Sequence, residues 1–163
     1  MTRLVLDASV CLKWFLIDEQ DAAQSLELRA HVRDGKVDLV EPPIWRCEIA
    51  SVLTRKHPAG ALGMITDLAI VGATIDSDAT CLRRAASLAI TLDHHLFDTI
   101  YHAVAIEHGI DLVTADEHYH RKARRLGHIV LLCDWRTPNE VHEEPASYRV
   151  RARKSPARAR RKR

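Results

Sequence analysis

The sequence lacks any apolar run close to the roughly 20 residues that a membrane-spanning helix requires. Asp7 interrupts the apolar segment at the N-terminus, which also argues against a signal peptide. We therefore expect a cytoplasmic protein with no membrane partner. With 163 residues, 47% hydrophobic and 28% charged, the chain is long enough for one domain with a sizeable core.

Cysteines are few and scattered, and no Cys-x-x-Cys pair occurs. The four are Cys11, Cys47, Cys81 and Cys133, and their neighbours are mostly apolar. A secreted disulfide framework is therefore not expected. We interpret all four as buried thiols of a protein in a reducing compartment.

Acidic residues are absent from the C-terminal segment, residues 149–163, which holds nine basic ones. Removing these nine from the 24 Lys and Arg leaves 15 against 22 Asp and Glu in residues 1–148, a net charge of −7. The whole-chain value of +2 therefore hides an acidic body and a basic tail. We expect residues 138–163 to be a Pro-containing, disordered basic tail.

This tail has two interpretations. It has the composition of a nucleic-acid-binding arm, in which Arg151, Arg153 and Lys154 would contact phosphates. It could equally be a solvated extension without function. Its basic residues are not interleaved with aromatics, and only Tyr148 lies beside them, so base stacking is not indicated.

Strand and helix signals alternate from residue 4 to residue 132. Apolar runs predict strands at 4–6, 37–40, 73–75, 111–113 and 129–132. Amphipathic spacing and caps, Asp93 among them, predict helices at 10–16, 21–33, 42–57, 64–71, 79–90, 94–108 and 116–126. Strands separated by helices predict one α/β domain, residues 1–137, with a short central parallel sheet flanked by helices in three layers.

Four acidic residues stand at apolar positions of this pattern. Asp7 and Asp116 each close a short apolar run, whereas Glu48 and Asp98 interrupt the apolar faces of expected helices. A carboxylate buried alone costs several kcal/mol. No Lys or Arg lies one turn away from Glu48, and Arg55 is two turns on. Four acids without matching basic residues suggest a bound cation.

Their expected positions support this interpretation. In an open parallel sheet, ligands bind outside the carboxyl ends of the strands, where Asp7 and Asp116 should lie. Mg²⁺ and Mn²⁺ prefer oxygen ligands of this kind, with Asp7, Asp98 and Asp116 as candidate ligands. Individually, Asp7 and Asp116 could be helix caps, and Asp98 could favour the positive end of its helix. Glu48 is the hardest of the four to explain in such a way.

The same residues carry a family resemblance. Leu4-Val5-Leu6-Asp7-Ala8-Ser9, the Glu48 helix, the segment 97–103 and the segment 112–117 resemble the successive motifs of PIN-domain nucleases. Within that superfamily the chain resembles VapC toxins of bacterial and archaeal toxin–antitoxin pairs, over residues 3 to about 135.

The resemblance implies a Mg²⁺- or Mn²⁺-dependent endoribonuclease that forms a homodimer and is inhibited by a small VapB-like antitoxin. It implies that Asp7, Glu48, Asp98 and Asp116 are catalytic and that Ser9 and Thr114 hydrogen-bond around them. It also implies that the helices on either side of residues 60–63 supply part of an antitoxin groove and of the dimer surface.

Two positions depart from the common pattern of that family. Ser51 stands where many relatives carry Asn three residues after the glutamate, and Phe97 stands where Tyr often precedes the third acid. Neither change removes a ligand. We expect Ser51 to contact Glu48 from this position, although the exchange of Asn for Ser weakens the case for that contact.

Two further groups of polar residues need an interpretation. Four histidines, His94, His95, His118 and His120, could suggest zinc. Residues one or two apart face different sides of a helix, so surface histidines are the better interpretation. The basic run that follows Asp116 is a candidate nucleic-acid patch or a solvated face, and it comprises Arg121, Lys122, Arg124 and Arg125.

Two other functions remain open at this point. One is a nucleic-acid-binding regulatory protein in which the acids are vestigial. The other is a phosphatase that works through an aspartyl phosphate at Asp7. The haloacid dehalogenase pattern requires a second aspartate two residues on, and this chain has Ser9 there.

Overall fold

The computed structural model describes residues 1–136. The basic tail expected at 138–163 lies outside the described residues. The strands are β1 (Thr2–Leu6), β2 (Val37–Glu41), β3 (Thr74–Ile75), β4 (Asp111–Thr114) and β5 (Ile129–Leu131). The helices are α1 (Ala8–Leu12), α2 (Ala22–Arg33), α3 (Trp45–Lys56), α4 (Ala61–Ala69), α5 (Ala79–Leu92), α6 (Leu96–His108) and α7 (Glu117–Ala123). Short 3₁₀ turns follow at Arg124–Leu126 and Leu132–Asp134.

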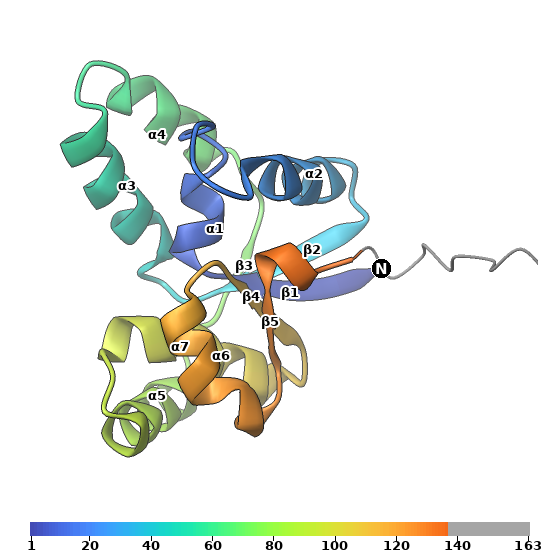
Figure 1. Cartoon of the computed structure of the whole chain (residues 1–163), viewed down its shortest axis with the longest axis vertical. Coiled ribbons are helices and arrows are strands. Elements are labelled where there is room, and N and C mark those ends of the chain that lie inside the picture. Colours follow the sequence, from blue (N-terminus) through green and yellow to red (C-terminus); the bar gives the residue numbers. More distant parts are fainter. Residues whose placement is uncertain (137–163) are drawn as a thin grey trace, which may run out of the picture.

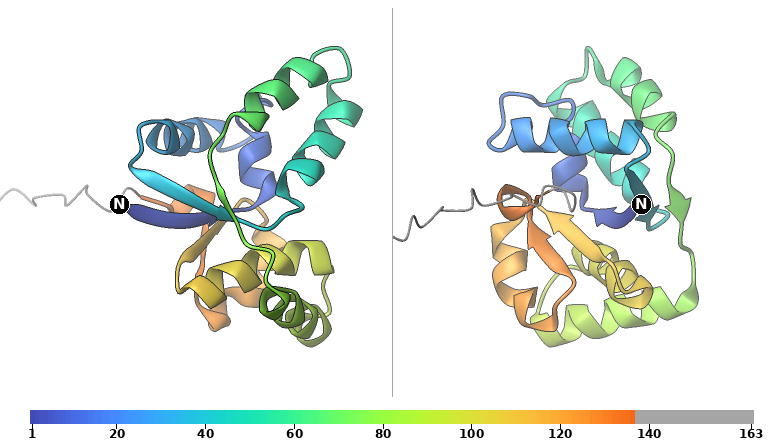
Figure 2. Two further views of the ribbon diagram at one scale, coloured as in Figure 1. Left: turned by 180° about the vertical axis from the view of Figure 1, so that it is seen from behind. Right: turned by 90° about the vertical axis from the view of Figure 1, so that its right-hand side faces the viewer.

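The five strands form one parallel sheet in the order β3-β2-β1-β4-β5. Helices α1–α4 lie on one side of the sheet and α5–α7 on the other (Figures 1 and 2). The predicted three-layer α/β fold is therefore confirmed. Both faces of the central strands are covered, which explains why Leu4–Leu6 and Leu112–Val113 are continuous apolar runs rather than alternating ones.

The strand β2 changes partner along its length. Its residues Val37, Asp38 and Leu39 pair with β1, whereas Val40 and Glu41 pair with β3. The ladder between β1 and β2 thus ends at the pair Leu4 and Leu39, before β1 itself ends at Leu6. The carboxyl ends of β1 and β2 are therefore not joined by ladder bonds.

Several predicted helix boundaries were wrong, and the helix predicted at 42–57 begins only at Trp45. The first helix is Ala8–Leu12 rather than 10–16, because it begins directly after its cap, Asp7, and gives way to turns at Lys13. Helix α4 begins at Ala61 and includes Gly63, whose surroundings are open. Asp93 does not cap the start of α6. It ends α5 in the left-handed conformation (φ 48°), and α6 begins after His95.

The cysteines are all free, but only two fit the expected environment. Cys11 and Cys81 are buried, whereas Cys47 is exposed on α3 and Cys133 is half-buried. The prediction of four buried thiols was therefore wrong for Cys47 and Cys133. Among the described helices, none combines the length and apolar character needed to cross a membrane.

Candidate active site

The carboxyl ends of β1 and β4 mark the point where the order of strands reverses. From β1 the chain builds outward through β2 to β3, and then returns to add β4 on the other side of β1. In parallel sheets this switch point opens a crevice that commonly holds the ligand. Asp7 directly follows β1 and Asp116 follows β4 by two residues, so both lie at this crevice.

Asp7 is fixed from both strands. Its Oδ1 accepts a hydrogen bond from the Ser9 amide at 2.8 Å, as the N-cap of α1, and its Oδ2 accepts one from Thr114 Oγ1 at 2.8 Å. Its own amide donates to the Val113 carbonyl at 3.0 Å. Burial raises the pKa of Asp7. The hydrogen bonds from Ser9 and Thr114 oppose that rise, and the charge of Asp98 adds to it.

Asp116 is joined to Asp7 through two hydroxyl groups. Thr114 Oγ1 accepts from the Asp116 amide at 3.0 Å while it donates to Asp7, and Ser9 Oγ accepts from the Ala115 amide at 3.1 Å. Asp116 Oδ1 accepts from the Tyr119 amide at 2.9 Å and so caps α7, which leaves Oδ2 outside the cap. The cap and the site are therefore compatible roles for this residue.

Glu48 enters the site from α3. Its Oε2 accepts a hydrogen bond at 2.8 Å from the hydroxyl of Tyr101, a buried residue of α6. Burial raises the pKa of Glu48, the Tyr101 bond opposes the rise, and the charges of Asp7 and Asp98 add to it. The pKa of Tyr101 is itself raised far above its usual range, mainly by burial and then by Glu48, so its hydroxyl stays a donor.

Asp98 enters from α6 and lies beside a histidine. The Nε2 atom of His94 is 3.0 Å from Asp98 Oδ2. Burial raises the pKa of Asp98, the neighbouring His94 side chain opposes this rise, and the negative charge of Asp116 adds to it. Burial, followed by the charges of Asp98, Asp7 and Asp116, also raises the pKa of Tyr119. Two carboxylates that follow β1 and β4 and two from α3 and α6 therefore face a common volume.

The donor set of this volume suits a hard divalent cation. Within residues 1–136, no three His, Cys, Asp or Glu side chains are positioned to enclose a metal ion as they stand. Mg²⁺, however, usually keeps several waters and uses one or two carboxylates, so it needs no closed cage. A cation would also offset the burial and, to a smaller extent, the mutual repulsion that raise the pKa values of Asp7, Glu48 and Asp98. Asp7, Asp98 and Asp116 could hold such an ion.

The histidines depart from the surface interpretation at one position. His95 and His118 are exposed and His120 is partly exposed, but the side chain of His94 is only 8% exposed. Its ring lies against Tyr119 at a centroid distance of 4.8 Å and beside Asp98. His94 was therefore wrongly predicted to be a surface residue, because contacts between α7 and the loop before α6 cover it.

Two other predicted residues have different surroundings from those expected. The backbone carbonyl of Ser51, rather than its hydroxyl, accepts hydrogen bonds from Thr54 and Arg55, and the hydrogen bond to Glu48 comes from Tyr101. The Lys122 ammonium donates to the carbonyls of Leu92 at 3.1 Å and Asp93 at 2.7 Å, where α5 ends. It thereby ties α7 to α5.

The other basic candidates are either exposed or undescribed. Arg121, Arg124 and Arg125 are exposed on α7 and on the turn after it. Arg151, Arg153 and Lys154 lie outside the described residues.

Sequence reasoning missed Tyr101 and Glu41. Tyr101 supplies the hydrogen bond to Glu48, and Glu41 is completely buried at the end of β2. One signal for Glu41 was available, since it follows the apolar run 37–40 as Asp7 follows the run 4–6. No local pattern marks Tyr101, because its partner is 53 residues away.

The chain is thus an α/β protein in which the switch point of a parallel sheet gathers acidic residues from two strand ends and two helices. The family model described as PIN domain matches residues 4–125, and the chain belongs to this family. Comparison with curated proteins gives no match.

Solved structures share the fold at low sequence identity. A chain of the VapBC2 complex from Rickettsia felis, bound to a DNA fragment from the promoter of VapBC2, is 16% identical over 80% of this chain and 97% of that chain, with a TM-score of 0.58. Mycobacterium tuberculosis VapC20, described as a Sarcin-Ricin loop cleaving toxin, is 15% identical over 72% and 93%, with a TM-score of 0.57. DNA-bound VapBC from Salmonella typhimurium is 15% identical over 82% and 100%, with a TM-score of 0.59.

Proposed function

We propose that the chain is a Mg²⁺- or Mn²⁺-dependent endoribonuclease and the toxin of a VapBC-type toxin–antitoxin pair. The observation that carries this proposal is the convergence of Asp7, Glu48, Asp98 and Asp116 at the switch point of a PIN-family sheet. Their crowding favours a cation, and the fold is shared with chains of VapBC complexes.

Asp7, Asp98 and Asp116 would hold the cation, which when bound supplies Lewis acidity and lowers the pKa of a water. Glu48 is the candidate to accept the proton of the attacking water, since its raised pKa makes it a stronger base than an ordinary glutamate. The Tyr101 hydroxyl would orient it. The water oxygen bonds to phosphorus in line with the departing O3′, and the P–O3′ bond breaks. The O3′ takes up a proton from solvent, while the proton of the attacking water goes to Glu48. The products carry 5′-phosphate and 3′-hydroxyl ends.

RNA as the substrate is supported by similarity to a toxin that cleaves the Sarcin-Ricin loop. The acidic body, at net −7 for residues 1–148, would repel a polyanion unless local positive charge offset it. The exposed Arg121 lies on α7, the helix that Asp116 caps, and the exposed Arg124 and Arg125 lie on the turn that follows it, so these three residues could provide that charge. The basic tail is a second source.

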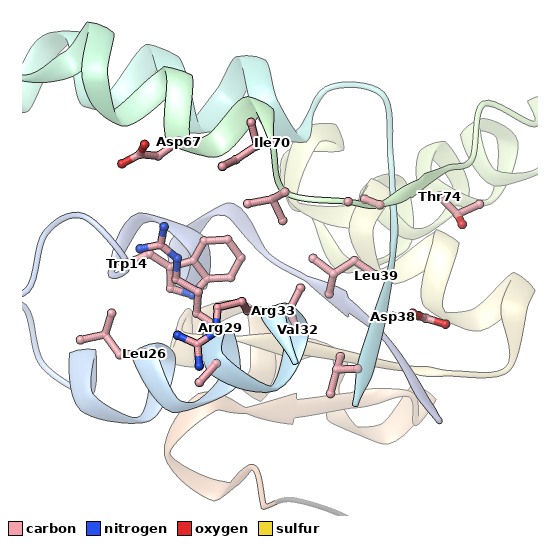
Figure 3. A pocket seen from close by; sticks show the side chains of 15 residues that line it. Trp14, Leu26, Arg29, Val32, Arg33, Asp38, Leu39, Asp67, Ile70 and Thr74 are labelled. Carbon is pink, nitrogen blue, oxygen red and sulfur yellow. The ribbon is translucent and has the colours of Figure 1, made fainter. Parts of the chain in front are cut away.

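A VapB-like antitoxin would dock in a groove on the α2 side of the molecule. This groove, of about 800 Å³, lies between α2, β2 and the end of α4 (Figure 3). Arg29 of α2 lies against Trp14, and Ile70 at the end of α4 is 82% exposed. Apolar walls with charged groups at the rim suit an amphipathic segment of a partner protein. Helix α4 begins at Ala61, within the segment 60–63 whose flanking helices the family resemblance implicates.

The decisive experiment incubates the purified chain with cellular RNA in Mn²⁺, in Mg²⁺ and in EDTA, and then sequences the new 5′ ends. We expect metal-dependent cleavage at defined positions and its loss in Asp98→Asn. Asp67→Asn, on α4 outside the acidic site, is the matched control. RNA retention without cleavage would favour the regulatory alternative, and a trapped phospho-aspartate would favour the phosphatase.

The antitoxin and the homodimer need separate tests. Light scattering at micromolar concentration should give the mass of a dimer, and a monomer would contradict that part of the proposal. An antitoxin encoded beside the chain should lose affinity when Ile70→Glu places a charge in the groove. Unchanged binding would remove the groove from the interface.

A further inference from the structure

Glu41 is a buried carboxyl group without a basic partner at hydrogen-bonding distance among the described residues. It is the last residue of β2 and is completely inaccessible. Its Oε1 accepts a hydrogen bond at 2.9 Å from the amide of Leu6, the residue before Asp7. Within residues 1–136, its Oε2 has no hydrogen-bond partner. Such a group costs free energy to bury, so its retention calls for a role.

The Leu6 amide needs this acceptor because β2 leaves β1 early. The ladder between the two strands ends at Leu4 and Leu39, and Glu41 pairs with Ile75 of β3 instead. Leu6 is buried, so its amide must find another acceptor or remain unsatisfied. The Glu41 side chain reaches back across the gap and supplies one.

The next peptide is held from the opposite side. The Asp7 amide donates to the carbonyl of Val113 on β4 at 3.0 Å. The Glu41 bond on the β2 side and the Val113 bond on the β4 side together fix the backbone from which the Asp7 side chain departs. Loss of either would let the end of β1 move relative to Thr114, the donor to Asp7 Oδ2.

The electrostatics of Glu41 fit this task. Burial raises the pKa of Glu41 well above its usual range, the Leu6 bond opposes the rise, and the charge of Asp7 adds to it. These shifts favour the protonated carboxyl, which offers a carbonyl oxygen to Leu6 without placing another negative charge beside Asp7. Glu41 thus differs from the four acids that face the site.

We infer that Glu41 is a positioning residue for Asp7, acting through its hydrogen bond to the Leu6 amide. The consequence for cleavage rests on the proposed nuclease function, whereas the hydrogen bond itself does not. Asp7 would contact the cation or the water, and Glu41 would act only through the backbone of β1.

Three variants of the full chain test this inference. Glu41→Gln keeps the acceptor and the shape, Glu41→Leu removes the acceptor, and Leu28→Ala truncates a buried residue of α2 as a control for general loss of stability. At a temperature where all remain folded, we expect Glu41→Leu to lose roughly 10- to 100-fold in kcat, the effect typical of lost outer contacts in metal sites. KM should change little. Glu41→Gln should restore most of the activity, and Leu28→Ala should keep it.

Equal activity in Glu41→Leu and the wild-type chain would overturn the inference, as would Glu41→Gln being as impaired as Glu41→Leu. An equal loss of kcat in Leu28→Ala would do the same, because it would reduce the effect to stability. If Glu41→Leu does not fold, Glu41→Ala takes its place.

A readout without RNA separates this inference from the proposed function. Amide hydrogen exchange of Leu6, measured by NMR on metal-free protein, should be as slow as that of Val5 in the wild-type chain and in Glu41→Gln. It should be faster in the variants that lack the acceptor. An unprotected Leu6 amide in the wild-type chain would overturn the inference whatever the enzymology. A wild-type chain that protects Leu6 but cleaves no RNA would instead count against the proposed function.

Discussion

The acidic site should make the stability of the metal-free protein fall as pH rises. Burial raises the pKa values of Asp7, Glu48 and Asp98. The folded state therefore binds protons more tightly than the unfolded chain, whose carboxyl groups titrate near roughly 4. The free energy of unfolding is highest below that value and decreases as pH rises through the raised folded values.

The substitution Asp7→Asn isolates one member of this group. Asn keeps an acceptor for the Ser9 amide but places an amide donor opposite the Thr114 hydroxyl, which already accepts from Asp116. The lost hydrogen bond costs about 1 kcal/mol. The opposing effect is electrostatic. For each pKa unit by which Asp7 in the folded protein exceeds Asp7 in the unfolded chain, the wild-type protein loses about 1.4 kcal/mol of unfolding free energy at high pH. Asp7→Asn should be the less stable protein near pH 4 and gain on the wild type toward pH 8.

The measurement is urea unfolding in EDTA between pH 4.5 and pH 8, with Asp18→Asn, an exposed position between α1 and α2, as the control. As pH rises, Asp7→Asn should gain unfolding free energy relative to the wild type. The Asp18→Asn control should show no such gain. RNA cleavage by Asp7→Asn should be absent throughout. A difference independent of pH, or one that drifts toward the wild type, would refute the electrostatic description of the site.

Three further outcomes are expected. Mn²⁺ and Mg²⁺ should raise the melting temperature, by the equivalent of about 2.7 kcal/mol at a hundredfold excess over Kd, and a shift with Zn²⁺ alone would contradict the oxygen-ligand assignment. Tyr101→Phe removes the hydrogen bond that lowers the pKa of Glu48, so the acidic limb of the pH–rate profile should move to higher pH. The control Tyr119→Phe loses the hydrogen bond to His102 and should leave the acidic limb in place. Truncation to residues 1–148 should reduce the slope of log K for RNA against log salt by roughly 0.7 for each lost phosphate contact. Identical slopes would leave Arg121, Arg124 and Arg125 as the candidate patch.

The sheet and the positions of two acids were predictable because both depend on local signals. Five apolar runs separated by helices are sufficient to predict a parallel sheet, and residues that directly follow strands are placed at its carboxyl edge by the chain itself. Asp7 and Asp116 owe their predictability to this rule. Their helix caps were visible for the same reason, since a cap depends on neighbours two or three residues away.

The contacts that complete the site depend on elements distant in the sequence. The bond from Tyr101 to Glu48 joins two helices on opposite sides of the sheet, and the burial of His94 depends on α7. The role of Glu41 depends on where β2 changes partner, which no periodicity records. Asp93 shows that a local signal can also be ambiguous, because a residue able to cap the start of a helix can also adopt the left-handed conformation that ends one.

The central place of β1 has a consequence during synthesis on the ribosome. This strand is made first, yet the hydroxyl that bonds Asp7 belongs to Thr114, 107 residues later. At about 5–20 residues per second, roughly 5–20 s separate the two. Throughout that interval the nascent chain can hold Asp7 and Glu48, but it has neither β4 nor Asp116. The acidic site therefore cannot assemble until β4 and Asp116 have been synthesised, which delays the proposed RNA cleavage to a late stage of synthesis.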